Sequence, residues 1–160
     1  MTRTAAPPRE FEPEFVEGLR TLFEERIVFN KVLGLKITSV SPGRAAGSLQ
    51  MKSDLIGHFA FQRVHGGVIS AGLDAMGGLA AMTAIGARHM EDPPEQRLFR
   101  FAKLGTIDLR VDYLRPASGD RFDLTAEVLR LGSRVATTRM EFLDADGKLL
   151  AVGAAAYIVS

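Results

Sequence analysis

The apolar stretch between Arg63 and Arg88 constrains this sequence most strongly, because it carries a single formal charge, Asp74. Its alanine, valine, leucine, isoleucine and methionine residues fall on every side of a helical wheel, which predicts a helix buried all round from about 66 to 89. A buried carboxylate is costly unless it is paired or hydrogen-bonded. We therefore expect Asp74 to act in catalysis. A structural carboxylate that caps a neighbouring backbone segment is the alternative.

The composition excludes several classes of protein. The chain has 160 residues, which suits one domain, and a net charge of +1 gives no electrostatic case for a nucleic-acid partner. It contains no cysteine, which excludes a disulfide, a thiolate metal site and a cysteine nucleophile. The three histidines, His58, His65 and His89, lack metal-ligand spacing, so we expect neither a metal nor a cofactor.

The ends of the chain and its apolar run indicate a cytoplasmic protein without a membrane partner. Residues 64–87 are interrupted by Asp74 and by glycines, so they are too polar at the middle to cross a bilayer. The first eight residues lack the apolar region of a signal peptide. We expect residues 1–10 to be a disordered lead and residues 11–160 to form a single domain.

An amphipathic helix is predicted from about 13 to 29, with Pro13 at its first position. Its apolar side chains recur at helical spacing, and its other face is charged. This pattern favours packing against the core over recruitment of another protein. The apolar stripe consists of Phe15, Leu19, Leu22, Phe23 and Ile27.

Six segments alternate apolar and polar residues or are bounded by turn residues, which predicts strands. They are 35–40, 44–52, 106–114, 122–131, 135–143 and 149–159. Between them, 53–63 is expected to be a loop and 91–97 an exposed link. Short connections indicate an antiparallel sheet. The predicted class is α+β, a curled antiparallel sheet of about six strands wrapped around one long buried helix, with an extra N-terminal helix. One such sheet does not cover the whole helix, so we expect a dimer or a larger closed oligomer.

The motif His65-Gly66-Gly67 opens the predicted central helix, and Asp74 follows nine residues after the histidine. With the later Tyr113-Leu114-Arg115-Pro116, it resembles the hotdog-fold acyl-CoA thioesterase superfamily, and most closely the branch of the phenylacetate-pathway thioesterases. The resemblance covers roughly residues 30–160. It implies hydrolysis of acyl-CoA, with CoA as part of the substrate and active sites at the subunit interface of a homodimer or a dimer-of-dimers tetramer.

The resemblance also implies roles for individual residues. Asp74 would be the general base or the nucleophile, and the Gly67 backbone N–H would polarise the thioester carbonyl, with Gly66 as its neighbour. His65 would orient the loop or the substrate. The physical chemistry agrees, because glycines at a helix start leave N–H groups at the positive end of the helix dipole, open to a substrate.

One position departs from the family, which usually carries an asparagine where His58 stands. A histidine there can still donate to a carbonyl or hold a water, and it can also titrate near neutral pH. The neighbouring Phe59 could contact an acyl or aryl group. Gly57-His58-Phe59 also faintly resembles the His-Phe of hotdog dehydratases, although the expected Pro-Gly is replaced by Ala60-Phe61. A hydroxyacyl-thioester dehydratase or hydratase and a non-catalytic acyl-CoA binding protein are therefore the alternatives.

Overall fold

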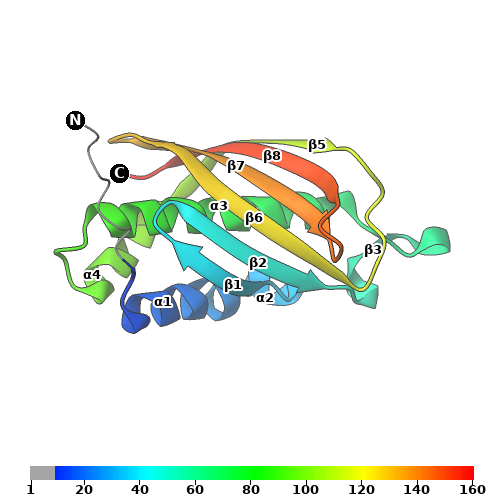
Figure 1. The fold of residues 1–160 in the computed structure, drawn as a ribbon, viewed down its shortest axis with the longest axis horizontal. Coiled ribbons are helices and arrows are strands. Elements are labelled where there is room, and N and C mark those ends of the chain that lie inside the picture. The colour runs from blue at the N-terminus through cyan, green and yellow to red at the C-terminus, as the bar shows by residue number, and fades with distance from the viewer. Residues whose placement is uncertain (1–9) are drawn as a thin grey trace, which may run out of the picture.

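A computed structural model describes residues 10–160, so the predicted lead at 1–10 lies outside the described residues except for Glu10. Six strands form one antiparallel sheet in the order β1-β2-β6-β7-β8-β5 (Figure 1). Their bounds are Lys36–Ser41 (β1), Arg44–Gln50 (β2), Gly105–Tyr113 (β5), Arg121–Leu131 (β6), Val135–Asp144 (β7) and Leu149–Ile158 (β8). The α+β sheet-around-helix prediction is confirmed.

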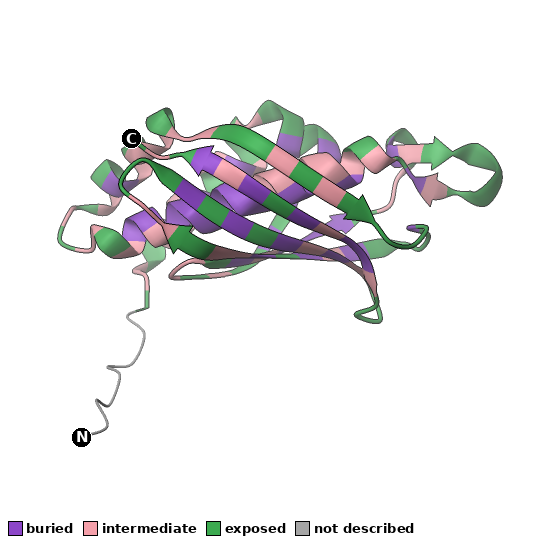
Figure 2. Ribbon diagram, turned by 90° about the horizontal axis from the view of Figure 1, so that it is seen from above, coloured by how far each residue is buried: buried purple, intermediate pink, exposed green. Residues whose placement is uncertain are grey.

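The alternation along the strands places one face of the sheet on the core, and Figure 2 shows buried and exposed residues alternating along it. On β6, Phe122, Leu124 and Ala126 are buried, and the Phe122 ring stacks on Phe142 of β7 at 5.2 Å. The strand β8, rich in alanine and glycine, lies inside the sheet between β7 and β5. A Cβ at Gly153 would lie 3.3 Å from the Leu73 side chain, so small residues here let the central helix approach closely.

The central helix α3 spans Gly66–Arg88, within one residue of its predicted end. Its middle is fully buried against β2, β6 and β7, with Leu73, Met76 and Leu79 at 0% exposure. Length and composition alone would let α3 cross a membrane, but 67% of its most apolar window is buried in the fold, as expected of a core helix. The expectation of burial all round is wrong for its first turns, where one face is only partly covered by the chain.

The predicted N-terminal helix is broken in the structure. It consists of α1 (Pro13–Arg20), a π-helical turn (Thr21–Arg26) and α2 (Val28–Leu33), with Ile27 in an extended conformation between them. The apolar stripe still packs on the core, and Phe15, Leu19 and Phe23 are buried. The break occurs because the Asn30 side chain replaces a backbone N–H of the helix: its Nδ2 donates to the Phe23 carbonyl oxygen at 3.0 Å.

Two segments predicted as irregular contain structure. Residues 53–63 include the strands β3 (Ile56–His58) and β4 (Arg63–Val64), which form a small hairpin that projects beyond the sheet (Figure 1). The predicted exposed link at 91–97 leads into α4 (Pro94–Phe99), followed by the 3₁₀ turn Arg100–Lys103.

The link is not exposed at Arg97, which is fully buried. Its guanidinium pairs with Glu12 and lies 4.4 Å from the centroid of the Phe15 ring. Burial lowers the pKa of this guanidinium from its usual value. Arg97 thus fastens α4 to the start of α1, a contact that only the tertiary fold creates.

Candidate active site

Two hydroxyl groups from the sheet hold the carboxylate of Asp74, which lies on α3. Thr106 Oγ1, on β5, donates to Asp74 Oδ1 at 2.9 Å. The Tyr157 hydroxyl, on β8, lies 3.1 Å from the same oxygen and 2.8 Å from the backbone carbonyl oxygen of Asp74. Within residues 10–160, no protein donor contacts Oδ2. The carboxylate is therefore fixed through one oxygen and available to a ligand through the other.

Tyr157 is almost fully buried, at 2% exposure, and burial keeps its hydroxyl protonated so that it acts as a hydrogen-bond donor. Burial raises the pKa of the Tyr157 phenol because the phenolate would lose its hydration, and the negative charge and hydrogen bond of Asp74 raise this pKa further. The phenol consequently keeps its proton at neutral pH and shares it between the backbone carbonyl oxygen of Asp74, at 2.8 Å, and Asp74 Oδ1, at 3.1 Å.

A cavity of about 240 Å³ opens beside Asp74. Asp74, Thr106, Tyr157 and Asn30 bring polar groups to its lining. Most of the remaining wall is apolar: Phe23, Ile27 and Phe29 from the N-terminal segment, Ala71, Ala75 and Gly78 from α3, and Phe101 and Leu104 before β5. An apolar cavity with a few polar groups at one place suits a ligand that joins an apolar tail to a reactive polar group.

At the start of α3, His65 is the N-cap residue, and its Nδ1 accepts a hydrogen bond from the Gly67 N–H at 2.8 Å. Because Nδ1 is the acceptor, the proton of neutral His65 is assigned to Nε2. The Gly66 N–H has no acceptor among the described residues. The predicted oxyanion donor, the Gly67 N–H, is thus already engaged, while its neighbour is open to a substrate oxygen.

Asp74 and the Gly66 N–H are far apart within one chain. Eight residues of α-helix separate them, a rise of about 12 Å. A thioester carbonyl needs its oxyanion donor and its base within about 3 Å of its reacting atoms. Asp74 and the helix start of the same chain therefore cannot both reach one carbonyl.

The hairpin of β3 and β4 holds His58 and Phe59 away from the Asp74 cavity. Phe59 is 82% exposed, and neither residue lines that cavity. Gly57 packs so closely on the start of α3 that a Cβ there would lie 2.6 Å from the Cα atom of His65. The dehydratase alternative requires His58 to pair with Asp74. Within a single chain His58 lies beside the helix start and does not make that pair.

Sequence reasoning found Asp74 but missed Thr106 and Tyr157. Thr106 looks like any polar residue of an alternating strand, and nothing in the sequence places it opposite α3. Tyr157 did carry a signal: a phenol in the apolar run Ala154-Ala155-Ala156-Tyr157-Ile158 needs a hydrogen-bond partner when buried.

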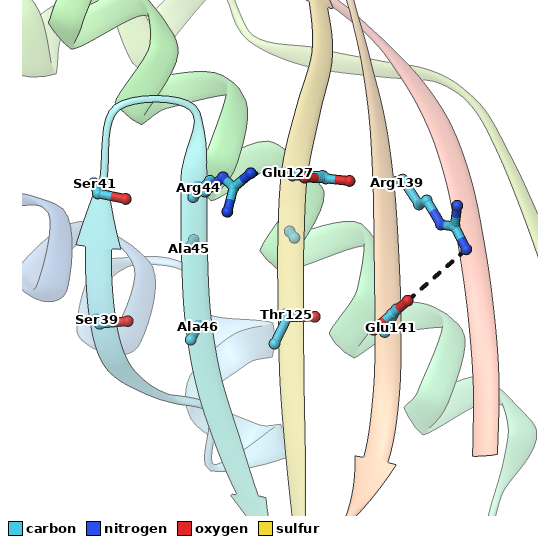
Figure 3. Close-up of a pocket in the computed structure, with 10 residues that line it drawn as sticks. Ser39, Ser41, Arg44, Ala45, Ala46, Thr125, Glu127, Arg139 and Glu141 are labelled. Atoms are coloured by element: carbon cyan, nitrogen blue, oxygen red, sulfur yellow. Dashed lines mark ion pairs between the residues drawn. The ribbon is translucent and has the colours of Figure 1, made fainter. Parts of the chain in front are cut away.

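A second recess, of about 370 Å³, lies on the outer face of the sheet and is shown in Figure 3. Its charged side chains come from β2, β6 and β7 and are already paired, Arg44 with Glu127 at 3.4 Å and Arg139 with Glu141 at 3.9 Å. It has no contact with the Asp74 site, and we do not assign the reaction to it.

Comparison with known proteins agrees with the geometry. Residues 61–151 match the family model of the thioesterase superfamily. The medium/long-chain acyl-CoA thioesterase YigI of Salmonella typhimurium is 36% identical over 138 residues, which cover 86% of this chain and 89% of YigI.

Solved structures share the fold. A crystal structure of a thioesterase-superfamily protein from Shewanella oneidensis has a TM-score of 0.85 and 37% identity, with 94% of this chain and 100% of that chain covered. The E. coli PaaI protein of the phenylacetic acid degradation operon superposes with a TM-score of 0.72 over 92% of this chain and 94% of PaaI, and its 18% identity speaks for the fold alone. The chain is a member of the thioesterase superfamily with the hotdog fold.

Proposed function

We propose that this protein hydrolyses acyl-CoA thioesters to the free acid and CoA, with Asp74 as the general base or nucleophile. The observation that carries the proposal is the Asp74 carboxylate, held through Oδ1 by Thr106 and Tyr157 at the edge of an apolar cavity. The activity that names YigI, hydrolysis of medium- and long-chain acyl-CoA, supports the same substrate class.

The reacting groups come from two copies of the chain in this proposal. The 12 Å rise between Asp74 and Gly66 calls for Asp74 of one subunit and the helix start of the other. The partly covered stripe of α3, which carries Gly66, Ser70 and Asp74, offers a face for the second copy. A homodimer, alone or within a tetramer, follows from this arrangement.

In the reaction, a backbone N–H at the helix start donates a hydrogen bond to the carbonyl oxygen and stabilises the negative charge that develops on it. The Gly66 N–H is the donor open to it, and the Gly67 N–H joins when it leaves His65 Nδ1. Asp74 Oδ2 either removes a proton from the attacking water or attacks the carbonyl carbon directly. In the general-base route the water oxygen bonds to the carbonyl carbon, the carbon–sulfur bond breaks, and the proton taken up by Asp74 passes to the CoA thiolate. In the nucleophile route the carbon–sulfur bond breaks to leave an acyl–Asp74 anhydride, and a water then hydrolyses it, giving the free acid and supplying the proton of the CoA thiol.

The other residues position these groups. Thr106 and Tyr157 hold Asp74 in one orientation, and His65 caps the helix so that its first N–H groups point outward. His58 and Phe59 lie on the hairpin beside the helix start, where they are placed to contact the substrate near the thioester. CoA is part of the substrate, and no cofactor enters the scheme; residues 10–160 contain no cluster of three or more potential metal ligands.

The test is release of free thiol from acetyl-, medium-chain, long-chain and aryl-CoA by the wild type and Asp74→Asn, after both are shown to fold. Loss of a general base lowers the rate by ~10²-fold or more. We expect turnover by the wild type and at least that loss in the variant. A folded Asp74→Asn protein with wild-type turnover, or a wild type inactive on the whole panel, would refute the proposal.

A further inference from the structure

The cavity beside Asp74 is closed by the N-terminal segment, which lies outside the motif that resembles the thioesterases. Asp74 and Gly78 lie four residues apart, on the same side of α3, and both line the cavity. A Cβ at Gly78 would lie 3.9 Å from the Phe23 ring. The cavity therefore extends along α3 for about one turn, roughly 6 Å, and reaches Phe23.

Two aromatic rings form the far wall. Phe23 and Phe101 pack edge to face, with their centroids 5.6 Å apart and their planes at 73°. Phe23 is 2% exposed and belongs to the hydrophobic core, so it has little freedom to move aside. This pair joins the π-helical turn to the 3₁₀ turn before β5, two segments that are distant in sequence.

A buried hydrogen bond fixes the wall in place. Asn30 is 4% exposed, and its Nδ2 donates to the Phe23 carbonyl oxygen. That carbonyl lies in the π-helical turn that precedes the break at Ile27. Because the Asn30 amide donates to this buried carbonyl oxygen, the turn is held in place and keeps the Phe23 side chain directed at α3. An irregular helical turn of this kind is common where a helix contributes to a site.

We infer that this cavity binds the acyl chain and that Phe23 and Phe101 form its end wall, which sets the chain length of the preferred substrate. The inference rests on the proposed thioesterase function and goes beyond it by naming the residues that select the substrate. The cavity, of about 240 Å³, ends at this wall roughly 6 Å along α3 from Asp74, so it limits the length of the chain that fits. The substrate class is thus acyl-CoA whose chain ends at or before Phe23 and Phe101.

The wall predicts the shape of a chain-length profile. Each methylene that enters the cavity should raise kcat/KM by about fourfold, the factor expected for burial of one CH₂. The rise should stop at the chain length that reaches Phe23 and Phe101 and give way to a fall for longer chains, since a well-packed wall does not yield without strain.

The experiment is this profile, from acetyl- to palmitoyl-CoA, for the wild type, Phe23→Ala, Phe101→Ala and Gly78→Ala. The Phe→Ala variants deepen the cavity and should move the optimum up by about two carbons or more. Gly78→Ala adds a methyl group in ordinary contact with Leu104, 3.5 Å away, and should move it down by about one carbon. Phe99→Ala is the control: this side chain is 79% exposed beside Phe101 but outside the cavity, and its profile should match that of the wild type.

A binding measurement covers the case in which a truncated Phe23 impairs folding or turnover. Calorimetric titration of Asp74→Asn with the same acyl-CoA series should give the wild-type optimum, and adding Phe101→Ala or Gly78→Ala should shift it in the directions stated. Folded variants that hydrolyse thioesters with an unchanged chain-length profile would overturn the inference and leave the proposed function standing. A wild type without thiol release would overturn both.

Discussion

At the scale of single residues, the site depends on an asymmetric carboxylate. Both hydroxyl donors contact Asp74 Oδ1, and this leaves Oδ2 for chemistry. The neutral donors orient the carboxylate without adding a competing positive charge. The raised pKa of Tyr157 keeps this phenol protonated at neutral pH, so β8 does not place a phenolate beside Asp74.

The raised pKa of Tyr157 predicts a loss of stability at alkaline pH. In the unfolded chain the phenol releases its proton near pH 10, but in the folded protein it keeps it to higher pH. Above about pH 10 the folded state binds more protons than the unfolded state, so stability declines as pH rises. This group should lower the free energy of unfolding by up to about 1.4 kcal/mol per pH unit. Urea titrations from pH 8 to 11 would measure the slope.

Two matched variants test this prediction. Tyr157→Phe should lose the contribution of Tyr157 to the pH slope of the unfolding free energy. Tyr113→Phe removes the only other tyrosine of the chain and should retain that contribution. Tyr157→Phe should also lower kcat about 10- to 100-fold, since it deletes a hydrogen bond to a charged group. A constant difference in unfolding free energy between wild type and Tyr157→Phe from pH 8 to 11 would contradict the assignment.

At the scale of helices and strands, close approach between α3 and the sheet decides which glycines are needed. A Cβ at Gly77 would lie 2.3 Å from the Tyr157 hydroxyl oxygen and 3.0 Å from its Cζ. A Cβ at the adjacent Gly78 would meet its nearest atom at 3.5 Å. Gly77 is thus needed to accommodate Tyr157, whereas the position of Gly78 can accept a Cβ atom in ordinary van der Waals contact.

These distances predict opposite effects for two alanine substitutions. Gly77→Ala should destabilise the protein by about 1–3 kcal/mol through overpacking, and it should displace Tyr157 from Asp74. Gly78→Ala should stabilise it by up to about 1 kcal/mol, because alanine favours the helix and meets no clash. Urea midpoints measure both. Equal shifts, or a Gly77→Ala loss that Tyr157→Phe does not partly relieve in the double variant, would show that Tyr157 is not the obstacle.

The sequence predicted the regular elements well and the irregular ones poorly. Alternation defines a strand locally, so all six strands of the main sheet lie within about two residues of their predicted bounds. The break at Ile27 was not predictable, because the apolar stripe continues across it and the cause is a side-chain contact between Asn30 and Phe23. The helix α4 lies within the link predicted at 91–97 because two prolines indicate an extended chain, although Pro94 also suits the first helical position that it occupies.

The same distinction applies to the site. Asp74 was recognisable because an isolated charge in an apolar helix is a local feature of the sequence. The Phe23–Phe101 wall was not, because 78 residues of chain separate two phenylalanines that the sequence alone marks only as apolar. Phe59 stays a predicted substrate contact, and the structure adds that it lies on the hairpin of β3 and β4, outside the Asp74 cavity.

At the scale of the whole molecule, the two edges of the sheet differ in a way that points to a second copy. The edge strand β1 is partly covered, because the Ile37 N–H donates to Glu24 of the N-terminal segment at 2.8 Å. The opposite edge, β5, is nine residues long and exposes Ile107 and Tyr113 to more than half. A long edge strand that exposes large apolar side chains, even between charged ones, is unusual in a lone protein. This edge carries Thr106 and so adjoins the site for which we propose two subunits.

Subunit complementation tests that arrangement directly. Gly66→Pro removes the N–H proposed to bind the oxyanion and suits the helix, since proline fits the first helical position and the extended conformation of His65 fits the residue before it. A Cβ at Gly66 would lie 3.4 Å from the Tyr113 ring, within van der Waals contact. Homodimers of Gly66→Pro and of Asp74→Asn should each lose at least ~10²-fold in activity. If Asp74 of one subunit works with Gly66 of the other, a heterodimer of the two variants regains one intact site and loses the second.

Co-expression of the two variants with different affinity tags, followed by tandem purification, would isolate that heterodimer. We expect about half of the wild-type activity per dimer, because one of its two sites contains both native groups. A heterodimer as inactive as its parents would place Asp74 and its oxyanion donor in the same chain, which an unbroken α3 does not allow. That outcome would contradict the two-subunit site. Another donor near Asp74 would then have to bind the oxyanion, and the loss in Gly66→Pro would reflect a disturbed helix start.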